Sequence, residues 1–374
     1  MGASCLACWT KRLCTRALLS LLALPTMAAD RVVITEEFTW DGCSHCPYAN
    51  RAFNNLINDP NNQVVDGTFT LVQYHIWDSY ATTWGNSRAS FYHMPGTPTA
   101  WFDGTLWDEG AWDNDQMMYN LYLSEYTTSR AVATDVTLSV TGVQDSGQTF
   151  TIRARAGVEA TGSPKTMRIY MVQVLDHWPT TFAYLRNGFK QAATSTEDVT
   201  LAAGQSQLVT RTFTFDTTSW VNQSNIKIIV WAQEPQADST HADPASTYQA
   251  AVLSWPFPPD CNADGAPDAT DIASGISADC NTNRIPDECD IAAGTSQDAN
   301  VNGVPDECET LRGDMNCDGT VNFRDINPFV LLLSDASAWQ VEYPACLLAN
   351  GDINADGSVN FRDINPFVQQ LSTP

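Results

Sequence analysis

The pattern of apolar and polar positions changes several times along this 374-residue chain. Residues 31–38 and 68–77 are rich in β-branched and aromatic side chains, which predicts two buried strands. Between them, residues 44–56 carry apolar side chains at helical spacing. A proline-marked segment at 94–104 predicts a short strand and a tight turn, and residues 113–129 predict a helix. The N-terminal third therefore predicts a mixed α/β domain.

Residues 131–258 have a different pattern. Short segments of alternating apolar and polar residues are separated by clusters of Gly, Asp, Ser and Thr; they lie at 136–140, 150–156, 167–174, 208–215, 226–232 and 248–255. This pattern predicts an antiparallel β-sandwich of about seven strands. Residues 179–194 fit no clear strand.

Two internal repeats follow the proline-rich boundary at 256–259. A 19-residue repeat places segment 260–268 again at 279–287 and 298–306, and a longer repeat places 314–325 again at 352–363. Such short units cannot bury a core alone, so we expect them to stack or to be cross-linked. The fold class is multidomain α/β plus all-β, and the expected units are 1–29, 30–130, 131–258, 259–309 and 310–374.

The first 29 residues are typical of a secretory signal. Lys11, Arg12 and Arg16 precede an apolar run at 17–24, and small residues at 26–29 offer a cleavage site. The run is too short for a membrane span, and no other segment has the required length. We therefore expect a secreted protein at the cell surface, in the envelope or outside the cell.

Charge and cysteine content narrow the function further. The formal net charge of −24 argues against nucleic acid as a partner, because phosphates would be repelled. From residue 260 onward there are 20 Asp and Glu against 4 Lys and Arg. Three of the 11 cysteines precede residue 29. The even number that remains predicts disulfides in an oxidising compartment.

The most reactive arrangement is Cys43-Ser44-His45-Cys46, which follows the first strand and opens the first helix. Unpaired amide N–H groups and the helix dipole stabilise a thiolate at a helix N-terminus, so Cys43 is the candidate nucleophile. Cys46 would resolve a mixed disulfide, and a charged His45 would stabilise the thiolate further. A static structural disulfide is the competing interpretation, and both stay open.

A strand, a CxxC helix, a second strand and Thr97-Pro98 before a third strand resemble the thioredoxin fold. More narrowly, residues 36–47 resemble thioredoxin-like bacterial envelope proteins that carry a β-sandwich behind this domain. The resemblance covers residues 32–129 and implies protein thiols or disulfides as substrates. It also implies that Pro98 is cis and that Thr97 faces Cys43 and Cys46, which makes Thr97 and Pro98 candidate site residues beside His45.

The duplicated C-terminal segment has the ligand spacing of a calcium loop, with oxygen ligands at positions one, three, five, nine and twelve, a backbone carbonyl at seven and Gly at six. The candidate calcium ligands are Asp314, Asn316, Asp318, Thr320, Asn322 and Asp325, then Asp352, Asn354, Asp356, Ser358, Asn360 and Asp363. With Asp rather than Glu at position twelve and one helix after each loop, the segment resembles a type I dockerin module.

That resemblance implies a cohesin-like or other surface protein as partner, recognised through Phe323, Arg324, Phe361 and Arg362. Pro328 and Pro366 depart from the dockerin pattern, and we expect them to interrupt each helix shortly after it starts. Cys317 and Cys346 have no counterpart in the other copy, and we expect them to pair.

The 19-residue repeats resemble thrombospondin type 3 calcium repeats. Their candidate ligands are Asp260, Asn262, Asp264, Asp268 and Asp271; Asp279, Asn281, Asn283, Asp287 and Asp290; and Asp298, Asn300, Asn302, Asp306 and Glu309. Arg284 stands where the repeat expects Gly, which weakens the second site. Four cysteines allow three pairings, of which Cys261 with Cys280 and Cys289 with Cys308 is the preferred one.

Two functional hypotheses follow. The first is a secreted thiol–disulfide oxidoreductase with calcium-binding repeats and a docking module. The second is a non-catalytic surface or scaffold component, for example of a polysaccharide-degrading assembly. No carboxylate pair in a domain of glycosidase size supports hydrolysis by this chain itself.

Overall fold

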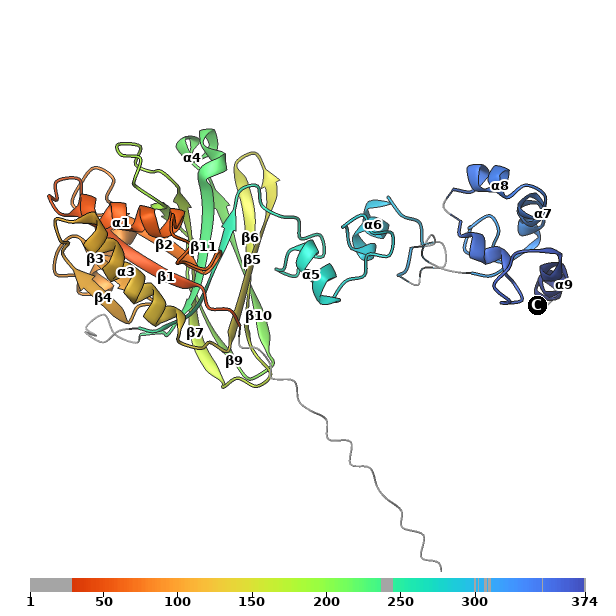
Figure 1. Cartoon of the computed structure of the whole chain (residues 1–374), viewed down its shortest axis with the longest axis horizontal. Coiled ribbons are helices and arrows are strands. Elements are labelled where there is room, and N and C mark those ends of the chain that lie inside the picture. Colours follow the sequence, from red (N-terminus) through yellow and green to blue (C-terminus); the bar gives the residue numbers. More distant parts are fainter. Residues whose placement is uncertain are drawn as a thin grey trace, which may run out of the picture.

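The computed structural model describes residues 29–236, 245–298, 301, 303–305, 308, 311–344 and 346–372 (Figure 1). Nearly all of the predicted signal segment lies outside these residues, so its cleavage stays a prediction. Within the described ranges, no helix is both long enough and apolar enough to cross a membrane.

The N-terminal elements are β1 (Val33–Thr39), α1 (Cys46–Asn58), β2 (Phe69–His75), α2 (Thr83–Phe91), β3 (Thr99–Phe102), β4 (Leu106–Glu109) and α3 (Asp115–Arg130). Strand β1 pairs in parallel with β2 and antiparallel with β3, which forms a hairpin with β4. The mixed α/β prediction is confirmed for this segment. The sequence patterns missed α2, whose apolar residues are few, and β4, which spans four residues.

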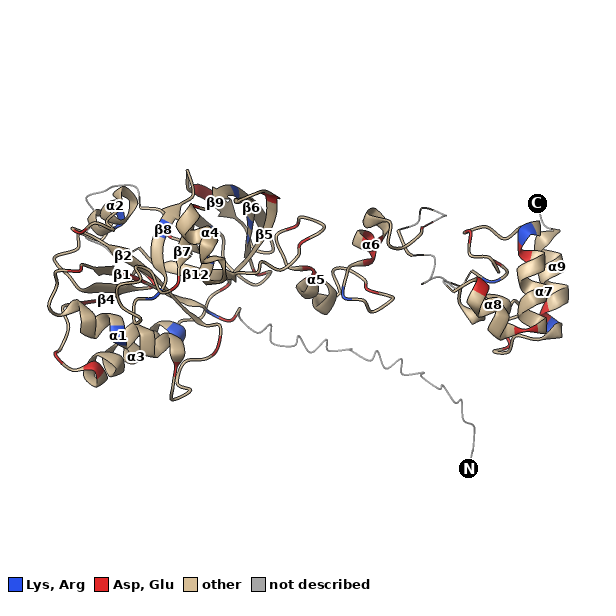
Figure 2. Ribbon diagram, turned by 90° about the horizontal axis from the view of Figure 1, so that it is seen from above, with Lys and Arg blue, Asp and Glu red and all other residues tan. Residues whose placement is uncertain are grey.

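Helices cover both faces of this part of the sheet. Figure 2 shows α1 and α3 on one face and α2 on the other. Phe53, Leu56 and Tyr122 are fully buried under α1 and α3, whereas Phe38 and Tyr74 are fully buried on the α2 side. Because strand side chains alternate between faces, β1 contributes to both cores.

Strands β5 to β12 follow, with short helices between β10 and β11. They are β5 (Val136–Ser146), β6 (Thr149–Val158), β7 (Lys165–Leu175), β8 (Gly188–Ala192), β9 (Glu197–Leu201), β10 (Ser206–Thr214), α4 (Thr217–Val221), η1 (Gln223–Asn225), β11 (Ile226–Gln233) and β12 (Thr247–Ser254). All six predicted strands are present. Strands β8 and β9 were missed because they are short and carry charged or glycine residues at their starts.

These strands form two sheets. One is three-stranded, in the order β10-β6-β5, and the other runs β12-β11-β7-β8-β2-β1-β3-β4, with β9 on β7. An apolar core that includes Ile152, Phe213, Ile228 and Val230 joins residues of both sheets. Gln73 of β2 pairs with Gly188 of β8, so a continuous sheet spans the two units expected at 30–130 and 131–258. The expected boundary near residue 130 is therefore not a break in the sheet.

The C-terminal part contains short helices: α5 (Asp268–Ser274), α6 (Asp287–Ala293), η3 (Phe323–Asp325), α7 (Ile326–Ser334), α8 (Ala336–Glu342), η4 (Leu348–Gly351), η5 (Phe361–Asp363) and α9 (Ile364–Leu371). Figure 1 shows α5 and α6 in the middle, with both sheets on one side of them and the group α7 to α9 on the other. That group has its own small core, in which Met315, Phe329, Trp339 and Phe367 are buried.

Two expectations about this part were wrong. Pro328 and Pro366 do not interrupt the helices, because they lie in the first turns of α7 and α9, where a backbone N–H has no intrahelical partner. The preferred cysteine pairing also fails: Cys261 bonds Cys289, and Cys280 bonds Cys308.

The repeat geometry explains the pairing. Cys289 lies in α6 of the second repeat, where its sulfur lies near Cys261 and Asp268 of the first. The second bond has the same separation of 28 residues as the first. Each cysteine at the start of a repeat, Cys261 or Cys280, therefore bonds the later cysteine of the next repeat. It does not bond the cysteine at the start of the next repeat. The expected Cys317–Cys346 bond is present.

Candidate active site and candidate calcium loops

The Cys43–Cys46 disulfide lies where β1 leads into α1. Cys46 is the first residue of α1 and is 1 % exposed, whereas Cys43 in the preceding loop is half-buried. The backbone N–H of Cys46 donates to Cys43 Sγ at 3.0 Å. After reduction, the same N–H and the helix N-terminus would stabilise a Cys43 thiolate. The more accessible sulfur is thus the better nucleophile.

Thr97 and Pro98 lie beside this disulfide. The Thr97–Pro98 peptide is cis, as expected, and Thr97 O lies 3.5 Å from Cys43 Sγ. Pro98 O in turn accepts from Gly110 N at 2.7 Å, which ties the segment to the end of β4. The bond from Gly110 therefore holds the backbone that lies next to the Cys43 sulfur.

His45 is the residue before α1, and its ring is about half exposed. Its Nδ1 lies 3.0 Å from Ser44 Oγ and its Nε2 lies 3.4 Å from Asp113 Oδ1. Such exposed ion pairs contribute little to stability. His45 can add positive potential near Cys43 when it is protonated.

Glu37 is a site residue that the sequence patterns did not single out. It is fully buried in β1, and its Oε2 accepts from Gln73 Nε2 at 2.7 Å. With its amide nitrogen turned toward the carboxylate, Asn50 donates to Glu37 Oε1 at 2.6 Å and to Cys46 O at 3.3 Å. Burial raises the pKa of Glu37 to about 8, although the Gln73 bond opposes this shift. Asn50 thus links the buried Glu37 carboxyl to the backbone carbonyl of the second cysteine.

A sequence signal for Glu37 existed. Glu37 stands among the apolar residues Val33, Ile34 and Phe38 of a strand that leads directly into a cysteine pair, and a buried carboxylate at such a place is a candidate functional group. The adjacent Glu36 makes this signal difficult to recognise, because two acids in succession are typical of an exposed strand end.

His75, Asp41 and Asp78 form a cluster beside the same loop. His75 Nδ1 lies 2.7 Å from Asp78 Oδ2 and 3.6 Å from Asp41 Oδ1. The Asp78 carboxylate also accepts from the backbone N–H groups of Asp41 and Tyr80. His75 Nε2 is buried without a partner among the described residues, whereas a metal-bound histidine normally donates its other nitrogen. The cluster is therefore best explained as an anchor of the loop.

The first 19-residue repeat forms a loop around its acidic residues. Asp260 Oδ1 accepts from Asp264 N at 3.0 Å, and Asp260 Oδ2 accepts from Gly265 N at 3.2 Å. Asp271 is fully buried, and its Oδ1 has no hydrogen-bond partner among the described residues. Burial and nearby carboxylates raise the pKa of Asp271. An unpaired buried carboxylate oxygen is the kind of group that a calcium ion would satisfy.

The second repeat has the same turn. Asn283 N and Arg284 N donate to Asp279 at 3.1 and 3.0 Å, and Arg284 takes the backbone conformation that Gly265 has in the first repeat. The third repeat is described only in part: Gly303 N donates to Asp298 Oδ2 at 2.9 Å. The predicted ligands Asn300, Asn302, Asp306 and Glu309 lie outside the described residues.

The two longer loops match one another closely. Asp314 and Asp352 each accept from the backbone at positions five and six, and Asp325 and Asp363 each accept from the N–H groups of positions three and nine. Asp325 and Asp363 are fully buried. Burial and the neighbouring Asp325 raise the pKa of Asp314 to about 6. Crowded, buried carboxylates of this kind fit a cation.

The carboxylates do not yet converge tightly. Within the described ranges, three groups of His, Cys, Asp or Glu side chains bring their ligand atoms within 4.8 Å of one another, and none is the full acid set of a predicted loop. Two of these groups combine Asp268 or Asp287 with cysteines that are consumed in disulfides. Calcium therefore stays a proposal.

The predicted partner-binding residues are accessible. Phe323 and Phe361 are 76 % and 75 % exposed, and each begins a one-turn helix that forms the last three residues of its loop. Arg324 and Arg362 follow them, also exposed. Both aromatic side chains are therefore available for contact with another molecule.

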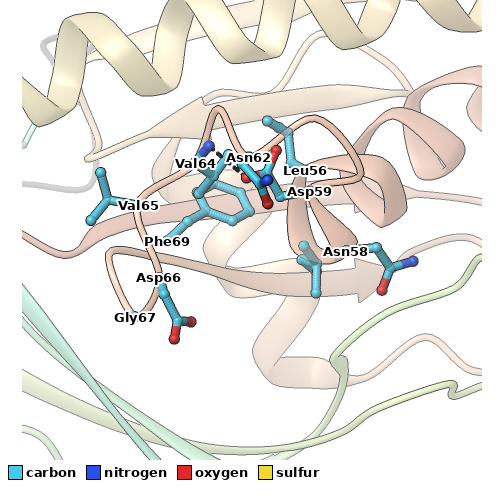
Figure 3. Close-up of a pocket in the computed structure, with 10 residues that line it drawn as sticks. Leu56, Asn58, Asp59, Asn62, Val64, Val65, Asp66, Gly67 and Phe69 are labelled. Atoms are coloured by element: carbon cyan, nitrogen blue, oxygen red, sulfur yellow. Dashed lines mark hydrogen bonds between the residues drawn. The ribbon is translucent and has the colours of Figure 1, made fainter.

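A cavity of about 290 Å³ lies at the other end of α1 from the disulfide (Figure 3). Asp59 is one of its lining residues, but the carboxylate accepts from the backbone N–H groups of Gln63 and Val64. These bonds close the loop that leads to β2. The cavity has no contact with the cysteine pair that would give it a role in redox chemistry.

Comparison with known proteins adds little. No protein-family model and no curated protein matches the sequence. Among solved structures, HBP35 of Porphyromonas gingivalis is similar with a TM-score of 0.47 at 15 % identity, over 60 % of this chain and 75 % of that chain. A β-glucosidase from Kluyveromyces marxianus, in a glucose complex and in a selenomethionine-labelled form, has TM-scores of 0.20 and 0.19 at 9 % and 8 % identity. The two matches cover 33 % of this chain and 14 % and 15 % of those chains. These scores do not establish a shared family.

Proposed function

We propose that this protein is an exported thiol–disulfide oxidoreductase whose residues 30–130 act as a thioredoxin-like domain. The observation that carries the proposal is the Cys43–Cys46 disulfide at the start of α1, with a buried carboxylate one amide away. The strand order β2-β1-β3-β4 and the position of Thr97 against Cys43 support it. The four disulfides found among the described residues accord with an oxidising location.

The chemistry follows from these positions. The Cys43 thiolate attacks a substrate disulfide, so a Cys43–substrate bond forms and the other substrate sulfur leaves as a thiolate. Cys46 then gives its proton to the Glu37 carboxylate and attacks Cys43 Sγ. The mixed disulfide breaks, the second substrate sulfur leaves, and two electrons have moved to the substrate. The reverse sequence oxidises a substrate dithiol.

The test is exchange activity with a model disulfide and with a dithiol peptide. Wild type should be active, Cys43→Ser should be inactive, and Cys46→Ser should accumulate a mixed disulfide that mass spectrometry detects. Equal behaviour of wild type and Cys43→Ser would remove the enzymatic proposal.

The alternative function is a non-catalytic surface or scaffold component. Mild reduction separates the two, because an active Cys43–Cys46 bond opens while the other three disulfides remain. A cysteine pair that resists reduction as strongly as Cys317–Cys346 would favour the scaffold.

We also propose calcium binding in the C-terminal region, supported by the unpaired oxygen of Asp271 and the crowding of Asp314 and Asp325. Bound calcium would neutralise these carboxylates and hold the loops closed. The exposed residues Phe323 and Phe361, with the arginines that follow them, would then present a duplicated face to a cohesin-like or other surface protein. Isothermal titration with calcium should reveal binding that chelation reverses.

A further inference from the structure

Glu37 lies in a row of three cross-strand neighbours. It pairs with Ala100 of β3, and Ala100 pairs with Asp108 of β4. Directly opposed residues point to the same face of a sheet. Glu37 and Asp108 therefore both face the side covered by α1 and α3, and only the methyl group of Ala100 stands between them.

Tyr122 of α3 covers this row. Its ring stacks on Phe53 with 4.2 Å between centroids and lies 5.6 Å from Phe102, and the side chain is fully buried. The hydroxyl has no hydrogen-bond partner among the described residues. Burial, and then the carboxyls of Glu37 and Asp108, raise the pKa of Tyr122 well above its usual value. The unpaired hydroxyl thus belongs to a side chain that is buried in the same cluster as Ala100, on the face of the sheet to which Glu37 and Asp108 point.

Asp108 leads from this buried position toward the surface. Its side chain is half-buried, and its Oδ2 is buried without a partner among the described residues. Glu125 lies three residues after Tyr122 on α3, is also half-buried, and has its pKa raised by burial and by Asp108. Residues three apart are neighbours on a helix surface, so α3 offers a second carboxyl at the edge of the same row.

We propose that Tyr122, Asp108 and Glu125 form a proton relay that connects Glu37 with solvent. The proposal rests on the thiol–disulfide exchange proposed above. A hydroxyl can accept a proton at its oxygen while it gives up its own hydrogen, and unpaired buried polar groups are the ones that bind ordered water. Within the described residues, β2 and α1 present the amides of Gln73 and Asn50 to Glu37. His75, two residues after Gln73 on β2, lies on the same face of the sheet, and its Nδ1 pairs with Asp78.

The reaction needs such a connection. With the pKa of Glu37 near 8, most molecules carry a proton on this carboxyl at neutral pH, and that proton must leave before Glu37 can accept another from Cys46. Cys46 is 1 % exposed and Glu37 is fully buried, so solvent does not reach these two side chains directly. The speed of the relay would then set how fast Glu37 becomes available.

A single-turnover experiment tests this. Protein with the Cys43–Cys46 pair reduced is mixed with excess of a symmetric chromogenic disulfide, which releases one coloured thiolate when Cys43 attacks and a second when Cys46 attacks. Wild type should release the second thiolate in one phase. Tyr122→Phe should show a fast phase from molecules with ionised Glu37 and a slow phase, roughly fivefold slower or more, from the rest.

The pH dependence makes the test specific. In Tyr122→Phe the fast phase should grow as pH rises through about 8, the pKa of Glu37, because more molecules start ionised. Loss of packing alone would slow every molecule equally and give one slower phase. Asp108→Asn changes a residue of strand β4 rather than of helix α3, and it should also release the second thiolate in two phases. Tyr119→Phe is the matched control, because its hydroxyl bonds Gln63 Oε1 instead and the variant should behave like wild type.

Two outcomes would overturn the relay, and they differ. If wild type releases both thiolates while Tyr122→Phe and Asp108→Asn do so in one phase at the wild-type rate at every pH, the relay alone is wrong. If wild type releases no second thiolate, the proposed redox function fails with it.

Discussion

Glu36 and Glu37 are adjacent in β1, yet their carboxylates lie on opposite faces of the sheet and have opposite partners. Glu36 Oε1 accepts from Arg88 Nε at 2.8 Å in a two-point ion pair on the α2 side. Among the described residues, Glu37 bonds the amides of Gln73 and Asn50 on the α1 side. The first carboxylate has a buried cation as its partner, whereas the partners of the second are neutral amides. One dipeptide thus supplies a structural ion pair and the proposed proton acceptor.

Glu37→Gln should change how stability depends on pH. The pKa of Glu37 is about 8 in the folded chain and 4.5 without burial, so the folded state is penalised as pH rises from about 4.5 to 8. At about 1.4 kcal/mol for each unit of that difference, the penalty at pH 8 is on the order of a few kcal/mol. The variant lacks the ionisable group, so its advantage over wild type should grow with pH across this window.

Urea unfolding at several pH values measures the effect, with Glu109→Gln on the exposed side of β4 as control. Parallel pH profiles for wild type and Glu37→Gln would contradict the assigned environment. The variant should also lose the second step of thiolate release while Cys43 still attacks.

Glu36→Gln should destabilise the protein by about 3–5 kcal/mol, because Arg88 would remain as a buried charge without its partner. A double variant Glu36→Gln, Arg88→Met should recover part of the loss. Asp198→Asn is the contrasting control, since its pair with Arg168 is exposed and worth about 0–1 kcal/mol. Denaturant midpoints measure all three, and equal losses for the buried and exposed pairs would be the opposite result.

The local pattern predicted most of the elements because apolar periodicity records which face of a strand or helix is buried. Strand β1, helix α1 and strand β3 all lie close to the expected ranges, and Thr97 meets Cys43 as expected. Long-range relationships left no such record. The pairing of Gln73 with Gly188 extends one sheet across the units expected at 30–130 and 131–258. It depends on which strand edges the rest of the fold leaves unpaired.

The same limit explains the errors at the site and in the repeats. Glu37 bonds Gln73 and Asn50, which come from two other elements and show no pattern of their own. The pairing of Cys261 with Cys289 depends on where α6 lies against the preceding loop, and a repeat period gives spacing along the chain but not that position.

Removal of calcium should loosen the region after residue 259 and leave the two sheets intact. The reason is that the buried carboxylates of Asp314 and Asp325 crowd one another, and no Lys or Arg side chain pairs with either of them in the part of the chain that the structure describes. Hydrogen exchange with and without chelator measures this segment by segment. Asp314→Asn should weaken calcium binding, whereas Glu342→Gln, at the exposed end of α8, should not. Exchange that is insensitive to chelator would count against the calcium proposal.

Peptide mapping without reduction should recover Cys261 linked to Cys289 and Cys280 linked to Cys308. Cα atoms of these pairs lie 6.0 and 5.8 Å apart, within the range that a disulfide spans. Both links tie one repeat to the next, so reduction of them should also weaken calcium binding in the repeats. Recovery of Cys261 linked to Cys280 would show that the repeats stack differently.

Gly104→Ala should destabilise the sheet far more than Gly110→Ala. Both glycines have positive φ, 67° and 79°, so each substitution costs about 1 kcal/mol or more in backbone conformation. At Gly104 a Cβ would also collide with the carbonyl oxygen of Ala245 and lie 2.7 Å from Gln233 Nε2, whereas nothing lies within 4 Å at Gly110. Overpacking of this kind adds about 1–3 kcal/mol.

Gly104 lies where the β3–β4 turn meets the segment before β12. Its variant should therefore loosen the contact between residues 30–130 and residues 131–258. A lower unfolding midpoint with new proteolytic cleavage near β12 would confirm this, and equal midpoints for the two variants would show that the turn does not carry the contact.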